Sequence, residues 1–326
     1  AVSYLVNAED GEQRIYGVYS NAVKAAEDNT ATLMYDYQGG ARVDVEDTQG
    51  ILDLGGHTYT YSSNNAIVYS TKDNGSITIK NGTMITTNNK SDGIDMLGSN
   101  TSVRLEKVDM TVSGGMYGIV TNGNESNNAI TLKNSTLNVP DGYGIYFPSS
   151  GSVAIEDSVI NAKYSGVQMC SGSLTVKGDK TEITTTGEPQ PKTENDGPIA
   201  DGAAISVINR SYPGGTPTMS ITGGTFSSEN TDAVKAYTFS NTDKTEGEWE
   251  DAKESVSISG GTFSSDVTDY LDDGCKLDET GSVVPSDDSV ASIGNKGYHS
   301  LEAAITAAKE GDTVTLLKNV TEDVTI

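Results

Sequence analysis

Two aspartates lie three positions apart in the stretch SDGIDM (91–96). Hydrolysis of a glycosidic bond with inversion needs two carboxyl groups, one as acid and one as base, about 6.5–9.5 Å apart. Asp92 and Asp95 supply such groups, and Asp109 or Asp141 on neighbouring repeats could complete the pair. The alternative is that Asp-Gly-Ile-Asp is an ordinary entry into a β-strand. Asp92 and Asp95 are therefore the candidate catalytic residues.

Aromatic side chains form a second candidate site. Tyr117, Tyr143, Tyr146, Phe147 and Tyr164 fall within three successive repeats. Tyrosine combines an apolar ring with a polar hydroxyl, which suits it to stacking against sugar rings. Strand alternation predicts that Phe147 points inward and Tyr146 outward, and that Tyr117 and Tyr143 occupy equivalent corners. Tyr117, Tyr143 and Tyr146 are therefore the candidate glycan-binding residues, although packing at the corners is the simpler explanation.

An eight-residue phrase that returns seven times must position these residues. Self-similarity of this kind is typical of a solenoid, in which only the stacking of coils buries a core. The copies are ITIKNGTM (77–84), VRLEKVDM (103–110), ITLKNSTL (130–137), VAIEDSVI (153–160), LTVKGDKT (174–181), MSITGGTF (219–226) and VSISGGTF (256–263).

A second short apolar element precedes each copy of the phrase. Its anchor residues Ile67, Ile94, Ile119, Ile145 and Val167 recur at intervals of 27, 25, 26 and 22 residues. Two strands in each coil of this length, separated by Asn, Gly, Ser and Thr, indicate an all-β fold, a right-handed parallel β-helix. The residue before each anchor is Gly or Ala, which predicts a tight corner.

Alternation within the phrase predicts two columns of side chains. The inward column consists of Ile79, Leu105, Leu132, Ile155, Val176, Ile221 and Ile258. The outward column alternates in charge and consists of Lys80, Glu106, Lys133, Glu156 and Lys177. Because neighbouring strands lie about 4.8 Å apart, we expect the charges to pair across strands and to fix the register.

The chain divides into four parts. Residues 1–50 are expected to form an N-terminal cap with a short helix and strands, because an amphipathic helix can close the open end of a solenoid. Residues 51–270 form the β-helix, and residues 271–289 form an acidic linker. Residues 290–326 repeat the plan of the N-terminus and are expected to begin a second, similar module within a longer protein.

Two polar insertions interrupt the repeats. Segment 184–201 contains prolines, and segment 241–255 contains the only tryptophan, Trp249. Both are expected to leave the stack as loops, and loops on solenoids often carry function. Segment 229–288 holds 16 acidic and 4 basic residues, a net charge of −12.

The charge balance excludes several classes of partner. The net charge of −25 argues against nucleic acid, whose phosphates need Lys and Arg. No apolar run is long enough to cross a membrane. Cys170 and Cys275 have no CxxC spacing and no nearby His, so no metal site is expected. No cofactor is expected; Ca²⁺ is the one candidate, because DVTDYLDDG (266–274) is rich in oxygen ligands, but the stretch lacks the regular spacing of a calcium loop and a solvated acidic linker explains it better.

The C-terminal part of the chain shows a family resemblance. Segments 258–277 and 291–326 resemble the repeated modules of large secreted surface proteins of anaerobic Gram-positive bacteria, described as pectate-lyase-like β-helix or adhesin-type proteins. The resemblance implies a right-handed β-helix and an extracellular location at the bacterial cell surface.

Two enzyme families offer further comparisons. SDGIDM resembles the Asn-Thr-Asp-Gly-Ile-Asp stretch of polygalacturonase-type glycosidases, but the Asp-Asp, Gly-His-Gly and Arg-Ile-Lys motifs of that family are absent. Pectate lyases use Ca²⁺ and a basic residue on one face of the helix. Arg104 is the only arginine within a repeated strand, and a surface ion pair with Glu106 explains it more simply.

The sequence therefore favours a protein without enzyme activity. We expect an extracellular, adhesin-like β-helix segment that presents loops or a glycan-binding face to glycans or to proteins of a host or cell surface. The alternative is a polysaccharide hydrolase or lyase, or a glycan-binding module, that uses the face of residues 92–146. A carboxylate pair along a groove with a basic residue opposite would favour the enzyme.

Overall fold

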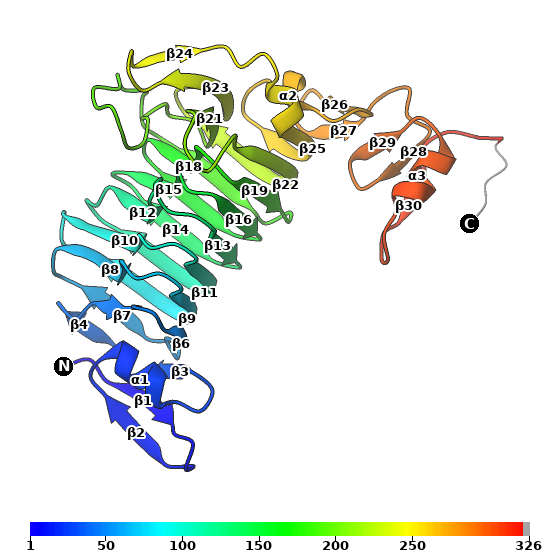
Figure 1. Ribbon diagram of the computed structural model, residues 1–326. Coiled ribbons are helices and arrows are strands. Elements are labelled where there is room, and N and C mark those ends of the chain that lie inside the picture. The colour runs from blue at the N-terminus through cyan, green and yellow to red at the C-terminus, as the bar shows by residue number, and fades with distance from the viewer. Residues whose placement is uncertain (322–326) are drawn as a thin grey trace.

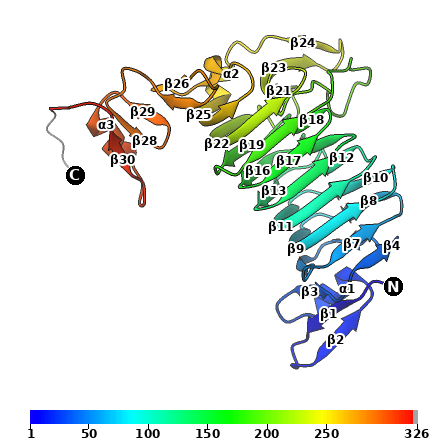
Figure 2. The same ribbon diagram turned by 180° about the vertical axis from the view of Figure 1, so that it is seen from behind.

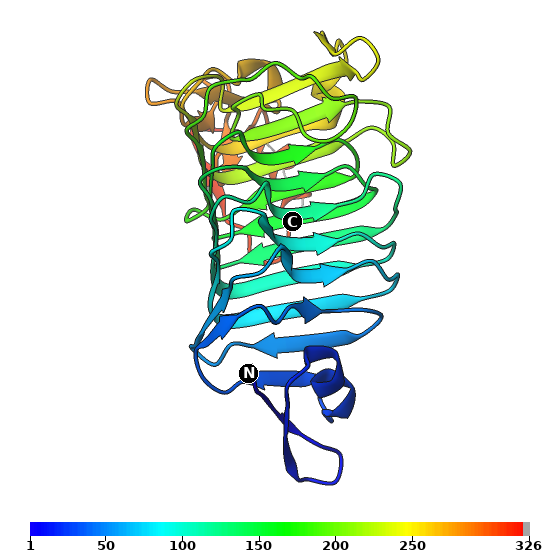
Figure 3. The same cartoon turned by 90° about the vertical axis from the view of Figure 1, so that its left-hand side faces the viewer.

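The computed structural model describes residues 1–321 and shows a parallel β-solenoid of about eight turns (Figure 1). Strands make up 48% of the chain and helices 7%, which confirms the all-β class. Turning the molecule shows the strands of successive coils stacked along the rod (Figures 2 and 3). The N-terminus lies near one end of the rod, and a small C-terminal unit lies beyond the other end.

One face of the solenoid is a nine-stranded sheet, which we name the covered face because loops lie on its outer side. The predicted anchors Ile94, Ile119, Ile145 and Val167 lie opposite one another in parallel register. The fifth, Ile67, lies one residue out of this register, because Val68 is the residue opposite Ile94. From one edge to the other the strands are β24 (Thr245–Gly247), β23 (Val234–Ser240), β21 (Ile205–Asn209), β18 (Ser165–Met169), β15 (Tyr143–Phe147), β12 (Tyr117–Thr121), β10 (Ser91–Met96), β8 (Asn65–Ser70) and β5 (Val43–Asp44).

A sixteen-stranded sheet forms the other two faces. Its strands are β1 (Tyr4–Asn7), β2 (Gln13–Tyr16), β3 (Thr30–Leu33), β4 (Tyr37–Gly39), β6 (Gln49–Asp53), β7 (Thr58–Tyr61), β9 (Ser76–Thr86), β11 (Ser102–Val112), β13 (Asn128–Lys133), β14 (Thr136–Val139), β16 (Gly151–Glu156), β17 (Val159–Ala162), β19 (Ser173–Lys177), β20 (Glu182–Thr185), β22 (Thr218–Ser228) and β25 (Val256–Phe263). We name the first halves of β9 and β11, together with β13, β16 and β19, the ladder face.

A turn of the solenoid contains three strands where the sequence predicts two. The corner inside the repeated phrase creates the extra strand, because the residue there has left-handed backbone geometry that Asn and Asp adopt more readily than most residues. The corner residues are Asn81 (φ 58°), Lys107 (φ 56°), Asn134 (φ 48°) and Asp157 (φ 46°). The chain bends at this point, and the rest of the phrase pairs on the third face.

Both predicted columns are present. All seven members of the inward column are at most 1% exposed. In the outward column Lys80, Glu106, Lys133, Glu156 and Lys177 lie opposite one another on successive coils. The Oε1 and Oε2 atoms of Glu156 lie 3.8 Å and 3.3 Å from the ammonium groups of the lysines on either side. Glu156 therefore pairs across strands as predicted, whereas Glu106 pairs with Arg104 on its own strand and Lys80 pairs with Asp53 of β6.

The corner before each anchor of the covered face is as tight as the sequence predicts. A Cβ atom on Gly93 would lie 2.3 Å from the carbonyl oxygen of Gly118, and one on Gly118 would lie 2.5 Å from that of Gly144. The same atom on Gly144 would lie 2.2 Å from the carbonyl oxygen of Gly166. Glycine is therefore needed at these three successive corners.

The N-terminal region closes one end of the solenoid with an antiparallel sheet and helix α1 (Tyr19–Ala25). Tyr4 on β1 and Tyr19 on α1 are both buried, and their rings pack edge to face with centroids 6.1 Å apart. Parallel pairing already begins between β3 and β6. Residues 30–44 therefore supply strands of the first turn.

The C-terminal unit has the same plan as the N-terminal cap. Strand β28 (Ala291–Ile293) pairs with β29 (Lys296–Tyr298) and β30 (Val314–Leu316), and α3 (Leu301–Ala307) lies between the last two in the sequence. The second module is expected to extend to residue 326, and residues 322–326 lie outside the described part of the chain.

The segment predicted as an acidic linker, residues 271–289, contains the hairpin of β26 (Cys275–Leu277) and β27 (Val283–Pro285). Leu271 and Val283 are buried in the same core as the last coils. These apolar side chains cover the open end of the stack, which explains why the segment is ordered. Short helices α2 (Ala252–Ser255) and η1 (Thr268–Tyr270) lie beside β25.

Candidate functional site

Three tyrosines form a row along one edge of the covered face. Tyr117 and Tyr143 open strands β12 and β15 and lie opposite each other in register, at equivalent corners. Tyr164 lies just before β18. The ring centroids are 6.2 Å apart for Tyr117 and Tyr143, and 5.6 Å apart for Tyr143 and Tyr164. Burial raises the pKa of Tyr117 and Tyr143, so both phenols stay neutral and can donate hydrogen bonds.

A loop of residues 186–204, between β20 and β21, lies against the outer side of the covered face. The side-chain amide of Gln168 donates to the carbonyl oxygen of Ile199 and accepts from its N–H, both at 2.7 Å. The Arg210 guanidinium donates to the carbonyl oxygen of Gly197 at 2.6 Å. These bonds replace water at buried polar groups and fix the loop to the sheet.

Tyr212 adds a further connection between the loop and the sheet. Its hydroxyl donates to Oδ1 of Asp196 at 2.8 Å and lies 3.2 Å from the hydroxyl of Tyr146. Tyr146 points outward, as strand alternation predicts, whereas Phe147 lies in the main core. Tyr146 is only 4% exposed, because it packs in an apolar cluster on the outer side of the sheet that includes Ile199 and that Tyr212 packs against. The Tyr146 ring stacks on that of Tyr117, with centroids 6.0 Å apart.

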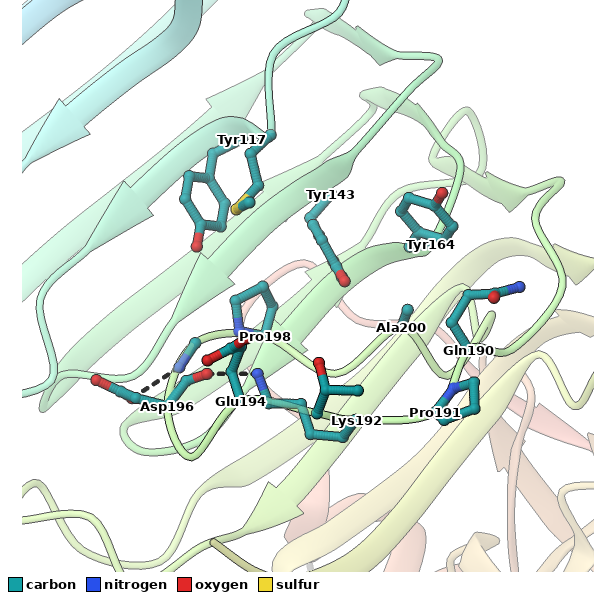
Figure 4. Close-up of a pocket in the computed structure, with 13 residues that line it drawn as sticks. Tyr117, Tyr143, Tyr164, Gln190, Pro191, Lys192, Glu194, Asp196, Pro198 and Ala200 are labelled. Carbon is teal, nitrogen blue, oxygen red and sulfur yellow. Dashed lines mark hydrogen bonds between the residues drawn. The ribbon is translucent and has the colours of Figure 1, made fainter. Parts of the chain in front are cut away.

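A pocket of about 410 Å³ separates the tyrosine row from the loop (Figure 4). On the loop side the wall includes Pro191, Lys192, Glu194, Asp196 and Pro198. In Figure 4 the three tyrosines lie on one side of this space and the loop residues on the other. The pocket is therefore walled by aromatic rings on one side and by prolines and charged groups on the other.

Two further hollows continue this pocket. One of about 500 Å³ shares the three tyrosines and adds Lys90, Asp92 and Asp141. The other, of about 220 Å³, shares Tyr117 and adds Tyr146 among others. The three hollows adjoin at Tyr117, and we name them together the tyrosine groove.

Asp92 lies in the tyrosine groove. Its Oδ1 accepts hydrogen bonds from the backbone N–H groups of Met116 at 2.8 Å and Tyr117 at 2.9 Å. Burial raises the pKa of Asp92, and these two bonds oppose the shift. Asp141 lines the same hollow, as the sequence suggested.

Asp95 lies on the same strand but does not line the groove. It is in register with Tyr69 and Val120, and its Oδ1 is buried without a hydrogen-bond partner within residues 1–321. Burial, reinforced by the charge of Asp92, raises the pKa of Asp95 to about 7, and the Arg42 guanidinium opposes that shift. The two candidate carboxyl groups therefore interact electrostatically, but only Asp92 faces the groove.

Two residues weighed for catalysis lie on other surfaces. Asp109 is exposed on β11, opposite Thr83 and Thr136 in the sixteen-stranded sheet, so the expectation that it could complete the carboxyl pair is wrong. Strand alternation at β11 places it there. Arg104 lies on the ladder face and forms the predicted ion pair, with Nε 3.2 Å from Oε2 of Glu106.

The sequence did not identify the loop side of the groove. Lys192, Glu194 and Asp196 lie in a segment without periodicity, so no pattern indicated where their side chains would lie. The available signal was the surplus length of the chain between the fifth and sixth coils, together with its prolines. Tyr164 belongs to the aromatic cluster noted in the sequence and completes the row of three.

Other kinds of site find little support within residues 1–321. No group of three or more His, Cys, Asp or Glu side chains is arranged to hold a metal ion in this described part of the chain. Cys170 is buried and Cys275 half-buried, and both are free. Across the same residues, no helix has the length and apolar character needed to traverse a bilayer.

Comparison with known proteins gives no assignment. No protein-family model, curated protein or solved structure matches the chain.

Proposed function

We propose that this chain is an extracellular, adhesin-like β-solenoid segment of a bacterial surface protein, and that it binds glycans in the tyrosine groove. The resemblance of segments 258–277 and 291–326 to modules of secreted surface proteins supports the location. The rod of stacked coils supports a role in presenting the groove at a distance from the surface that carries it.

The observation that carries the proposal is the tyrosine row facing loop 186–204 across a pocket of about 410 Å³. This volume lies in the range of roughly 300–1,000 Å³ that is usual for small-ligand sites. A sugar ring presents a C–H face that can stack on an aromatic ring and hydroxyl groups that bond to polar atoms. Neutral phenols and loop carboxylates offer both kinds of contact.

The groove is built before any ligand arrives. Tyr117 and Tyr143 are positioned by the parallel register of β12 and β15. Gln168 and Arg210 hold the opposite wall. A preformed site loses little conformational entropy on binding, which favours affinity from a small contact area.

A glycan array with the purified chain tests the proposal, with Tyr143→Ala as the site variant and Tyr35→Ala as the matched control. Tyr35 is a half-exposed tyrosine in the N-terminal region, far from the groove in the sequence and in the fold. We expect specific glycans to bind the unmodified chain and Tyr35→Ala equally. Tyr143→Ala should weaken binding about 30-fold, which corresponds to the loss of about 2 kcal/mol at an aromatic hot spot. Equal binding by all three proteins, or no glycan bound by any, would refute the proposal.

A polysaccharide hydrolase or lyase is the second candidate, and one observation favours it. Asp92 and Asp141 line the same hollow together with Lys90, and burial raises the pKa of Asp92, as a general acid working near neutral pH would require. The test is the release of reducing ends or unsaturated products from pectic and other polysaccharides. Turnover that is lost in Asp92→Asn would establish the enzyme, whereas intact polysaccharide after prolonged incubation would leave binding as the function.

A further inference from the structure

The tyrosine groove carries more acidic than basic side chains. Its carboxylates are Asp92, Asp141, Glu194 and Asp196, and its lysines are Lys90 and Lys192. None of the four carboxylates forms an ion pair within residues 1–321. On the ladder face, by contrast, Glu106 and Glu156 each lie within ion-pair distance of an Arg or Lys.

Three of these carboxylates are held in place through one oxygen only. Oδ1 of Asp92 accepts two backbone N–H groups, Oδ2 of Asp141 accepts the N–H of Gly114 at 3.1 Å, and Oδ1 of Asp196 accepts from Tyr212 and Gly197. The hydrogen bonds to Asp196 lower its pKa and keep it ionised. The second oxygen of each group has no hydrogen bond within the described residues. The carboxylates are therefore oriented but not neutralised.

The aromatic rings on this side of the solenoid already attract cations. The ammonium of Lys163 lies 5.0 Å from the ring centroid of Tyr164. The Arg42 guanidinium lies 4.2 Å from the ring centroid of Tyr69 on the same face. Ring faces attract cations electrostatically, most strongly where water is partly excluded. Because Lys163 already lies over the ring of Tyr164, the rings of Tyr117 and Tyr143 and the oriented carboxylates are the features of the pocket that can recognise a further ammonium group.

The two lysines of the groove do not cancel this preference. The Lys192 ammonium donates to the backbone carbonyl oxygen of Asp196, a hydrogen bond within loop 186–204. Lys90 forms no ion pair within residues 1–321 and lies in the hollow with Asp92 and Asp141, so two carboxylates face one ammonium there.

We propose that the tyrosine groove selects glycans that carry free amino groups, of the glucosamine type, over neutral and uronic-acid glycans. This inference rests on the proposed glycan-binding function and names its ligand class. The ammonium of the sugar would lie between a tyrosine face and the free oxygen of Asp92 or Asp196. The sugar ring would stack along the row. The net charge of −25 would attract such glycans and repel uronates.

The test is isothermal titration at pH 6 with three hexasaccharides: glucosamine, N-acetylglucosamine and galacturonate. We expect the glucosamine hexamer to bind roughly tenfold more tightly than its neutral N-acetylated counterpart, the gain usual for one well-placed charge pair. The galacturonate hexamer should bind least. Asp92→Asn and Asp196→Asn keep the side-chain shape and should each lower the affinity for the glucosamine hexamer more than that for the neutral hexamer, which removes most of the preference.

The control is Glu156→Gln, which removes one negative charge from the ladder face. If it lowers the affinity for the glucosamine hexamer as much as Asp196→Asn does, the attraction comes from the total charge and the inference fails. Equal or tighter binding of the neutral or uronate hexamer also overturns it. If the array detects a specific glycan while none of the hexamers binds, the inference fails and the proposed function stands. If the array detects none either, the proposed function fails with it.

Discussion

The ladder face and the covered face belong to the same coils but use their outward side chains differently. On the ladder face, Lys133, Glu156 and Lys177 pair with one another between coils and stay open to water. On the covered face, Gln168 lies on β18 and Arg210 directly follows β21. Both side chains are almost completely buried and donate hydrogen bonds to loop 186–204. One face uses polar groups to align the stack, and the other uses them to build a site.

The charges differ in the same way. Glu106 and Glu156 on the ladder face have a basic partner, whereas Asp92 and Asp95 on the covered face and Asp196 on loop 186–204 have none within ion-pair distance in the described chain. Asp44, at the edge of the covered face, pairs with Arg42. An unpaired carboxylate that is partly buried is costly for stability. A protein retains such groups most readily where they serve a function. The comparison therefore points to the covered face as the functional surface.

The largest expected difference in stability between the two faces concerns the buried side chain of Arg210. Arg210→Met should lower the free energy of unfolding by on the order of 2–3 kcal/mol, because it leaves the carbonyl oxygen of Gly197 and the amide oxygen of Asn241 without their donor. Arg104→Met on the ladder face should change it by less than about 1 kcal/mol. Urea unfolding of both variants measures this, and equal effects would remove the distinction between the two faces.

The next effect concerns the proton on Asp95. Its pKa is about 7 in the folded chain, against an ordinary value of 3.8 for an aspartate, so the folded state holds the proton more tightly than the unfolded state. The stabilisation is complete below about pH 4 and is lost as the pH rises through 7. The full shift corresponds to about 4 kcal/mol, and partial exposure reduces this to on the order of 2 kcal/mol.

Asp95→Asn should therefore stabilise the chain at pH 8 by on the order of 2 kcal/mol and change little at pH 4. Urea midpoints between pH 4 and pH 8 test this. Glu106→Gln on the ladder face is the control and should give no comparable gain at pH 8. A stability difference between Asp95→Asn and the unmodified chain that is independent of pH would contradict the account of Asp95.

The smallest effect is expected in the charge ladder. Glu156→Gln removes the partner of two lysines, but all three groups are solvent-exposed in part, so the loss should stay below about 1 kcal/mol. The difference should shrink further in 1 M NaCl, where the screening length is about 3 Å. Thermal unfolding at low and high salt measures this difference. A loss of stability above about 2 kcal/mol would show that the charge ladder stabilises the fold substantially as well as fixing the strand register.

The repeated phrase allowed much of the fold to be predicted. Ile79 and Ile155 lie in the inward column because strand alternation leaves few other arrangements for a phrase that recurs once in each coil. Asn134 shows the limit of this argument. Its left-handed backbone produces a corner and a third strand, which hydrophobic periodicity alone does not reveal.

The site could be predicted only on its strand side. Asp92, Tyr117 and Tyr143 follow from the register of the coils, and all three line the groove. The loop side depends on single contacts, such as the one between Gln168 and Ile199, that no repeat encodes. The exclusion of Asp95 from the groove likewise depends on local geometry.

Hydrogen–deuterium exchange of the chain, with and without its tightest glycan, tests the central claim most directly. The account predicts that the glycan slows exchange in residues 114–121, 140–147 and 186–204, the segments that line the tyrosine groove, and leaves residues 128–133 and 151–156 of the ladder face unchanged. Slower exchange on the ladder face, or none in loop 186–204 with bound glycan, would contradict the claim that the covered face is the binding surface.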